Sequence, residues 1–285
     1  MNQRRMKGDK VGSESAKRGH RAAAAALCAA MACSVCPVGS AQAATVKLTG
    51  AGDVRAQALA AFQTHGKFQV AVGTLSDAQR AELKMLIVGG SNLPANATGV
   101  KTAAYSQALA DVSLTGSTGY RWSRTTHTTW TTEGGERTVS CEATIYTVSL
   151  DYDVSAKAAA KARKRVHAAA SAAKGKGGAT TRVAYLYDWV QKQLAYTRSA
   201  MKWSTAKALS RGKGVCQDYA TTLIAACREI GIDARAVRCS ISGGSHMIVR
   251  IGGKYYDASS EDTHAGSRAY YAKTRKQMRK LGIRW

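Results

Sequence analysis

Three residues in the second half of the chain have the types and the order of a thiol catalytic site: Cys216, His246 and Asp257. Cys216 follows Gly214 and opens a stretch of helical spacing, so we expect it in the first turn of a helix. Unpaired N–H groups and the helix dipole favour negative charge there. A cysteine in such a place tends to ionise below the free-thiol pKa of about 8.5, and the thiolate is the nucleophilic form.

His246 and Asp257 lie in two short strand-like runs on either side of Gly252 and Gly253, which is typical of a tight β-hairpin. Because side chains alternate along a strand, the two residues share a face as diagonal neighbours. Ser259 shares that face as well, so alternation alone does not choose between them, but only Asp257 carries a charge that stabilises an imidazolium. The expected pairs are Ile251 with Lys254, Ile248 with Asp257 and His246 with Ser259.

This arrangement resembles the transglutaminase-like, papain-related superfamily over about residues 180–262. Residues 214–220 look like its nucleophile motif, and residues 231–237 look like the end of its helix and the strand that follows. Residues 245–246 and 253–257 look like its histidine and aspartate strands. The resemblance implies an α+β fold in which the nucleophile helix packs on an antiparallel sheet, preceded by a smaller mixed α/β N-terminal region. The residues upstream, 185–196, look like the helix and tyrosine that lead into this core in secreted bacterial members.

The resemblance implies acyl transfer through a thioester. Cys216 attacks an amide carbonyl, His246 takes the thiol proton and returns it to the leaving amine, and Asp257 fixes the imidazole tautomer. The backbone N–H of Cys216 is one expected donor to the oxyanion, and a side chain upstream is the second. By its place in the resemblance Tyr196 is the first candidate, with Trp203 next.

The sequence leaves open which acceptor, an amine or water, attacks the thioester. An amine gives transglutaminase-like crosslinking, whereas water gives a cysteine peptidase or amidase. A third alternative is a catalytically inactive surface-binding module. It is favoured by two departures from the family pattern: Met247 and Ile248 where many relatives carry Ala-Trp, and an aspartate about two residues early. A protein or peptide substrate is expected, with no cofactor and no metal, since no cysteine or histidine pairs have zinc spacing.

The N-terminal segment predicts export. Residues 1–21 carry seven Lys or Arg ahead of an apolar, alanine-rich run from Ala22 to about Cys36, and Ala41-Gln42-Ala43 has the small-x-small pattern of a signal-peptidase site. We therefore expect a signal peptide of residues 1–43, cleavage after Ala43, and a secreted or cell-envelope protein.

The remaining chain keeps 35 basic and 16 acidic groups, a formal charge of +19. The basic residues are dispersed and no nucleic-acid motif occurs, so we expect no specific nucleic-acid partner. Anionic cell-wall polymers or a membrane surface are the more plausible charged partners of an exported basic protein. The expected divisions are residues 1–43, an N-terminal region 44–178, a catalytic core 179–262, and a basic tail 263–285 whose charges we interpret as the solvated face of a terminal helix.

Two smaller hypotheses concern the remaining thiols and the aromatic residues. Cys227 is expected to be a small core residue, and a bridge from Cys141 to Cys239 is conceivable but not favoured. Aromatic residues in the two strands predicted over residues 120–130 and 138–152 could form a sugar-binding platform, but we expect them to pack in the core. These aromatic residues are Tyr120, Trp122 and Trp130.

Overall fold

The computed structural model describes residues 45–71, 73–89, 98–133, 136–259 and 268–285. The expected signal peptide and its cleavage after Ala43 lie outside these ranges. Within them, none of the helices combines the length and the apolar character that crossing a membrane would require. The described residues form two compact units, residues 125–144 and the remainder, and each is considered by itself.

The first part of the larger unit places helices against a sheet of strand order β1-β2-β5-β4. β1 pairs parallel with β2, and β2 pairs antiparallel with β5. Residues 53–62 and 76–87 have helical spacing in the sequence and fall within or beside α2 and α3, and Asp53 caps α2 by accepting a hydrogen bond from the N–H of Ala56. The elements are β1 (Thr45–Leu48), α2 (Val54–Gln63), β2 (Lys67–Ala71), α3 (Asp77–Gly89), β3 (Gly99–Val100), α4 (Ala103–Ser113), β4 (Ser117–Glu133) and β5 (Glu136–Tyr152).

The smaller unit consists of the parts of β4 and β5 within residues 125–144. The two strands are neighbours in the sheet, as the alternation in the sequence predicted. Within this unit the hydroxyl groups of Thr126 and Thr144 are 3.3 Å apart. The side chains of Trp130 and Cys141 lie outside the described part of the structure, so the hypotheses about them stay predictions.

The second part of the larger unit contains the nucleophile helix and a sheet of order β10-β9-β8-β11, with β3 also paired to β8. An alanine-rich stretch of the sequence forms a long helix that ends before the glycine-rich residues 175–178. The elements are α5 (Ala156–Lys174), α6 (Ala179–Gln193), β6 (Ala195–Tyr196), α7 (Thr205–Arg211), β7 (Lys213–Gly214), α8 (Cys216–Glu229), β8 (Ala234–Ile241), β9 (Gly244–Ile251), β10 (Lys254–Tyr256), α9 (Arg275–Lys280) and β11 (Ile283–Arg284).

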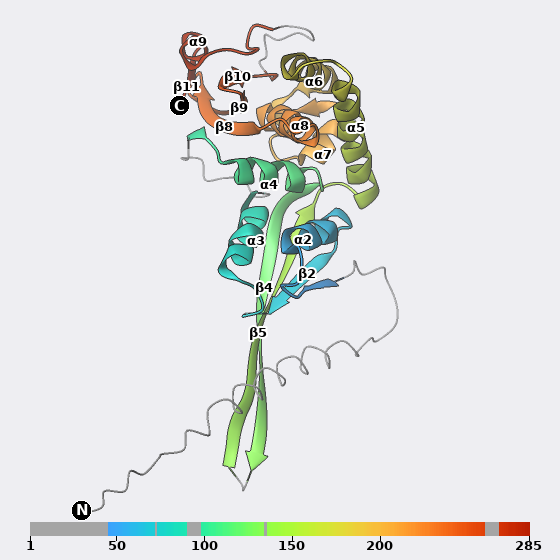
Figure 1. Ribbon diagram of the computed structural model, residues 1–285, viewed down its shortest axis with the longest axis vertical. Helices are drawn as coiled ribbons and strands as arrows, with labels where there is room; N and C mark the ends of the chain where they lie inside the picture. Colours follow the sequence, from blue (N-terminus) through green and yellow to red (C-terminus); the bar gives the residue numbers. More distant parts are fainter. Residues whose placement is uncertain (1–44, 72, 90–97, 134–135, 260–267) are drawn as a thin grey trace, which may run out of the picture. The chain divides into compact units, whose positions relative to one another are not determined.

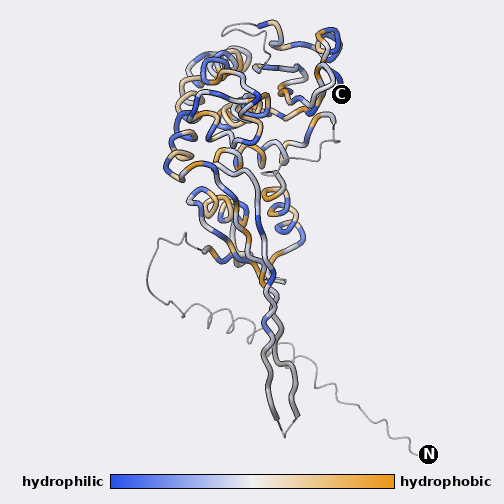
Figure 2. Tube along the Cα trace, turned by 180° about the vertical axis from the view of Figure 1, so that it is seen from behind, coloured by the Kyte–Doolittle hydropathy of each residue, from blue (hydrophilic) through white to orange (hydrophobic). Residues whose placement is uncertain are grey.

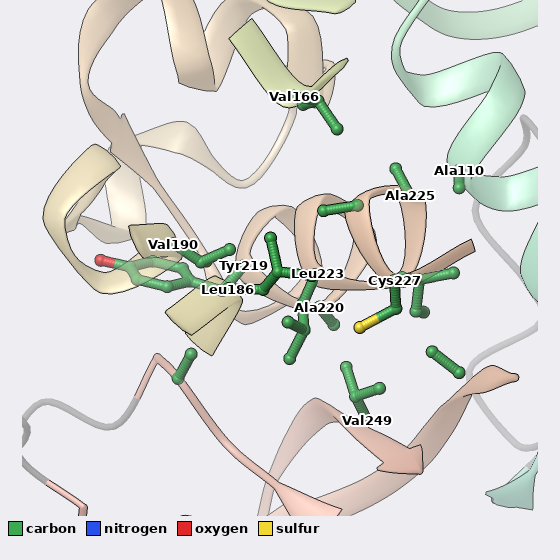
Figure 3. Close-up of a cluster of buried hydrophobic side chains, with 14 of the residues drawn as sticks. Ala110, Val166, Leu186, Val190, Tyr219, Ala220, Leu223, Ala225, Cys227 and Val249 are labelled. Atoms are coloured by element: carbon green, nitrogen blue, oxygen red, sulfur yellow. The ribbon is translucent and has the colours of Figure 1, made fainter. Parts of the chain in front are cut away.

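Helix α8 is the centre of the main hydrophobic core. It packs against β8 and β9 on one side and against α5, α6 and α7 on the other (Figure 1). Figure 3 shows Leu223 of α8 beside Leu186 and Val190 of α6, with Val249 of β9 below the helix. Apolar and hydrophilic residues alternate along the surrounding helices (Figure 2), which is the pattern of helices with one apolar stripe. Helix α8 is therefore enclosed by packing on several sides.

The fold is therefore α+β with antiparallel pairing around the nucleophile helix, as predicted. The core around α8 also includes residues of α4 and α5, such as Tyr105, Leu109 and Val166. These helices precede the expected boundary at residue 179, which stays a prediction. The N-terminal helices thus contribute directly to the packing that fixes the nucleophile helix.

Two of the three strand aromatics are exposed, contrary to the expectation that they pack in the core. Trp122 keeps 61% of its surface accessible and Tyr120 keeps 38%. The reason is that α2 and α3 do not reach far enough along the sheet to cover β4 at these positions, so the apolar face of the sheet continues beyond the packed core. By contrast, Cys227 is fully buried, as expected.

Candidate active site

Cys216 is the first residue of α8, and the residue just before it is held by a hydrogen bond to a side chain in the first turn of the helix. Asp218, in the first turn, accepts hydrogen bonds from the N–H of Val215 at 2.9 Å and from the Thr205 hydroxyl at 3.0 Å. A Cβ on Gly214 would lie 3.0 Å from the Asp218 side chain, so glycine is needed there for this close approach. These contacts fix the backbone just before the thiol.

Asp218 is almost fully buried. Burial raises the pKa of this carboxyl to about 7, and the charge of Asp153 adds to the increase, while the hydrogen bonds from Val215 and Thr205 oppose it. Asp153 in turn accepts hydrogen bonds from the backbone N–H and hydroxyl of Ser204, at 2.9 and 2.6 Å. A polar network therefore underlies the nucleophile loop, joining α7 to the start of α8.

The hairpin carrying His246 and Asp257 has the predicted register where the two strands pair. Lys254 is opposite Ile251, and Tyr256 is opposite Val249. β10 ends at Tyr256, so the two outer pairs expected from the sequence do not form as ladder pairs. His246 and Asp257 nevertheless meet directly, with His246 Nε2 and Asp257 Oδ2 2.7 Å apart.

Ser259 holds the other oxygen of Asp257 instead of competing for the histidine. Its backbone N–H and its hydroxyl donate to Asp257 Oδ1 at 2.9 and 2.7 Å. The Tyr187 hydroxyl donates to the Asp257 carbonyl at 2.7 Å. Asp257 is thus fully buried, and its Oδ1 is occupied by Ser259 while its Oδ2 faces the imidazole.

The electrostatics of the pair favour a charged histidine. Burial would lower the pKa of His246, but the charge and hydrogen bond of Asp257, together with the Cys216 side chain, outweigh it and raise the pKa to about 10. Burial would likewise raise the pKa of Asp257, yet the charge of His246 and the hydrogen bonds from His246 and Ser259 lower it on balance. The geometry therefore stabilises an imidazolium paired with a carboxylate.

The Cys216 side chain contributes to the raised pKa of His246, which places the thiol near the imidazole. Since Nε2 faces Asp257, Nδ1 is the nitrogen left for the thiol. Cys216 and Asp257 both line a small gap between α8 and the hairpin, and Cys216 is only partly buried. The fold thus brings the thiol, the imidazole and the carboxylate into one neighbourhood.

The two oxyanion candidates have different surroundings. Tyr196 lies beside Gly214 through the parallel pairing of β6 with β7, and it packs on the same core as Cys216. Trp203 precedes α7, and the Lys207 ammonium lies 5.1 Å from the centre of its ring. Tyr196 is therefore positioned by the strand that leads into the nucleophile, whereas the described ring contact of Trp203 is with a lysine.

Two residues of the site were missed as such from the sequence. Asp218 could have been found from its position three residues after Val215, the spacing of a helix-capping acid. The role of Tyr187 has no local signal in the sequence, because its hydroxyl group donates to a backbone carbonyl 70 residues away. Cys239 is a free, buried thiol, so it takes no part in the disulfide bridge that the sequence left conceivable. In the described part of the chain no group of His, Cys, Asp and Glu could hold a metal ion.

Comparison with known proteins gives a family match for the part of the chain that contains this site. Residues 166–279 match the model of the transglutaminase-like superfamily. A candidate cysteine protease from Cytophaga hutchinsonii is 16% identical with a TM-score of 0.29, and the alignment covers 49% of this chain and 65% of that one. A candidate protease from Parabacteroides distasonis is 11% identical with a TM-score of 0.27, covering 68% and 40%. No curated protein matches the chain.

Residues 166–279 therefore form a transglutaminase-like superfamily domain. Because the TM-scores to the two solved structures are low, this assignment rests on the family match. The matched segment begins within α5 and contains all five predicted site residues.

Proposed function

We propose that the protein is a thiol-dependent acyl transferase or hydrolase that acts on protein or peptide amides through a thioester on Cys216. The observation that supports this proposal best is the buried His246–Asp257 pair, 2.7 Å between Nε2 and Oδ2, with Cys216 close enough to influence the pKa of the imidazole. A thiol, an imidazole and a carboxylate that lie together are what nucleophilic catalysis by a thiol requires.

In the proposed reaction the Cys216 sulfur attacks the amide carbonyl carbon. Nδ1 of His246 holds the thiol proton and delivers it to the nitrogen of the leaving amine as the C–N bond breaks. Asp257 keeps the imidazole in the required orientation, because Ser259 fixes the carboxylate in turn. The backbone N–H of Cys216, at the unpaired start of α8, and the Tyr196 side chain are the proposed donors to the oxyanion.

The second half of the reaction needs an acceptor for the acyl group. An amine gives a new amide and water gives a carboxylate, and His246 removes the proton of either one. We favour amine transfer of the glutamine-to-lysine type, with peptide or amide hydrolysis as the alternative outcome of the same site. Anionic cell-wall polymers or membrane surfaces are proposed as secondary partners of the basic chain.

The site is tested by alkylation with iodoacetamide, since this reaction needs no knowledge of the substrate. The rate at Cys216, followed by peptide mapping, should fall in His246→Ala and in Asp257→Ala. His167→Ala is the matched control, because His167 is an exposed histidine paired with Glu229. If Cys216 reacts no faster than an ordinary thiol and its rate ignores His246, the proposal fails.

The acceptor is then identified by incorporation of a fluorescent amine into protein glutamines, compared with cleavage of the same proteins. Cys216→Ala is the blank in both assays. Incorporation without cleavage supports transfer, and cleavage alone supports the peptidase reading. We also propose export, for which N-terminal sequencing of the released protein should return Ala44, while an intact Met1 would contradict it.

A further inference from the structure

A second concave site lies away from the thiol and is lined by residues of α3 and of the sheet strands β2, β5 and β4. It is a groove of about 940 Å³, within the range of about 300–1,000 Å³ typical of small-molecule sites. All its lining residues belong to the larger unit. The function proposed above does not use this groove.

The floor of the groove is the apolar face of the sheet. Phe68 pairs with Val148 across β2 and β5, and Val70 pairs with Tyr146 one step further along. The side chains between them point to the opposite, polar face, where Gln69 hydrogen-bonds to a threonine of β5 at 3.1 Å. The sheet therefore continues its apolar face past the point where α2 and α3 cover it.

The wall and the rim have a different character from the floor. Along α3 the residues at helical spacing 80, 83, 84 and 87 line the groove, with Leu83 and Ile87 inside. On the opposite side Trp122 and Tyr120 of the edge strand β4 stand exposed, and the Trp122 ring lies 5.9 Å from that of Tyr146. A concave lining made mainly of apolar and aromatic side chains is the usual character of a small-molecule site.

The charges of the lining point to the head group of the ligand. Arg80 and Lys84 line the groove, and none of the described lining residues is Asp or Glu. Arg80 is engaged with Asp77 and with the Leu75 carbonyl. Lys84 forms no ion pair with any described carboxylate. A negative group beside Lys84 would complete the site.

The chemistry of the lining separates the possible ligands. A sugar chain needs many hydrogen-bonding groups, but apart from tyrosine hydroxyls and the two cations the lining is apolar. A flat membrane surface fits a convex patch better than a concave groove. We propose that the groove binds the acyl chain of a single-chain anionic amphiphile, taken up as a monomer, with its head group beside Lys84.

The test is calorimetric titration of the full chain with dodecanoate below micelle formation. We expect saturable binding of one molecule per chain. Each buried methylene contributes up to about fourfold in affinity, so octanoate should bind at least about tenfold more weakly. Dodecyltrimethylammonium, which has the same chain and the opposite charge, should also bind more weakly.

Two exposed substitutions locate the ligand without disturbing the core. Trp122→Ala should weaken dodecanoate binding about tenfold through lost apolar contact. Lys84→Glu should weaken it at least about threefold through charge reversal, and Lys157→Glu, on an exposed position of α5, should leave it unchanged. Thermal unfolding of each variant checks that the fold is intact.

Four outcomes would overturn the proposal. They are the absence of saturable binding, binding that ignores both Trp122→Ala and Lys84→Glu, binding to anionic vesicles without binding of monomeric dodecanoate, and a dimer that Trp122→Ala dissociates. The third outcome would identify a membrane surface as the partner, and the fourth would identify a second copy of the chain. None of them bears on the thiol chemistry, because the variants lie outside that site.

Discussion

Replacing Asp257 by asparagine should disable the thiol site even though it preserves the shape of the side chain. In the folded chain Oδ1 accepts two hydrogen bonds from Ser259 and Oδ2 faces His246 Nε2. Asparagine has a single acceptor oxygen, and the backbone N–H of Ser259 claims it. The amide NH₂ then faces Nε2, so the histidine proton moves to Nδ1, which can no longer accept the proton of Cys216.

The size of the effect follows from the charge that is lost. Two unit charges about 4 Å apart at an effective dielectric constant of about 20 interact by about 4 kcal/mol, which is about three pKa units. The charge and hydrogen bond of Asp257 oppose the effect of burial on the pKa of His246 and, with the Cys216 side chain, raise it. Without Asp257 the burial of His246 is unopposed and lowers its pKa. We therefore expect kcat/KM to fall about 1,000-fold or more.

The measurement combines turnover with alkylation of Cys216 at neutral pH. Alkylation of the asparagine variant should drop to the rate of an ordinary thiol, and Asp257→Ala should be no worse than Asp257→Asn. Asp233→Asn, which changes an exposed carboxylate, is the control. If Asp257→Asn keeps its activity within about tenfold of the unsubstituted chain, the orientation imposed by Ser259 does not operate as described.

Three further predictions concern the groups that support the site. Ser259→Ala removes the 2.7 Å hydroxyl bond to the carboxylate and should lower kcat/KM about tenfold, measured beside the alkylation rate. Because the pKa of Asp218 is raised to about 7, the folded chain binds more protons than the unfolded one between about pH 4 and 7, so stability falls as pH rises through that window. Asp218→Asn should remove up to about 4 kcal/mol of this pH dependence. Urea unfolding of both chains at about pH 4 and pH 7 measures it, and a difference in stability between the two chains that is the same at both pH values would contradict the prediction. Arg228→Met leaves Asp111 with one fewer cation and should cost about 1–3 kcal/mol of stability, seen in thermal unfolding; an unchanged Tm would show that the ion pair contributes nothing.

The sequence predicted the elements around the site because their signals are local. The helix that begins at Cys216 has a glycine-marked start and a regular apolar stripe, and the stripe is buried as expected. The hairpin register followed from the Gly252-Gly253 turn and from strict alternation. The same kind of pattern failed at Trp122, because alternation identifies the apolar face of a strand but not how far along that face the helices reach.

The order and spacing of Cys216, His246 and Asp257, and the family they resemble, were determined by the sequence alone, since each lies in a short motif with its own local signal. The tertiary structure decided which atoms meet. It placed Nε2 of His246 against Oδ2 of Asp257 and Ser259 against Oδ1 of the same carboxylate. It brought the Asp218 carboxylate to the N–H of Val215, just before the nucleophile. It also left a groove beside α3. These features depend on packing between segments distant in the chain, where burial and hydrogen-bond geometry act and local propensity carries no information.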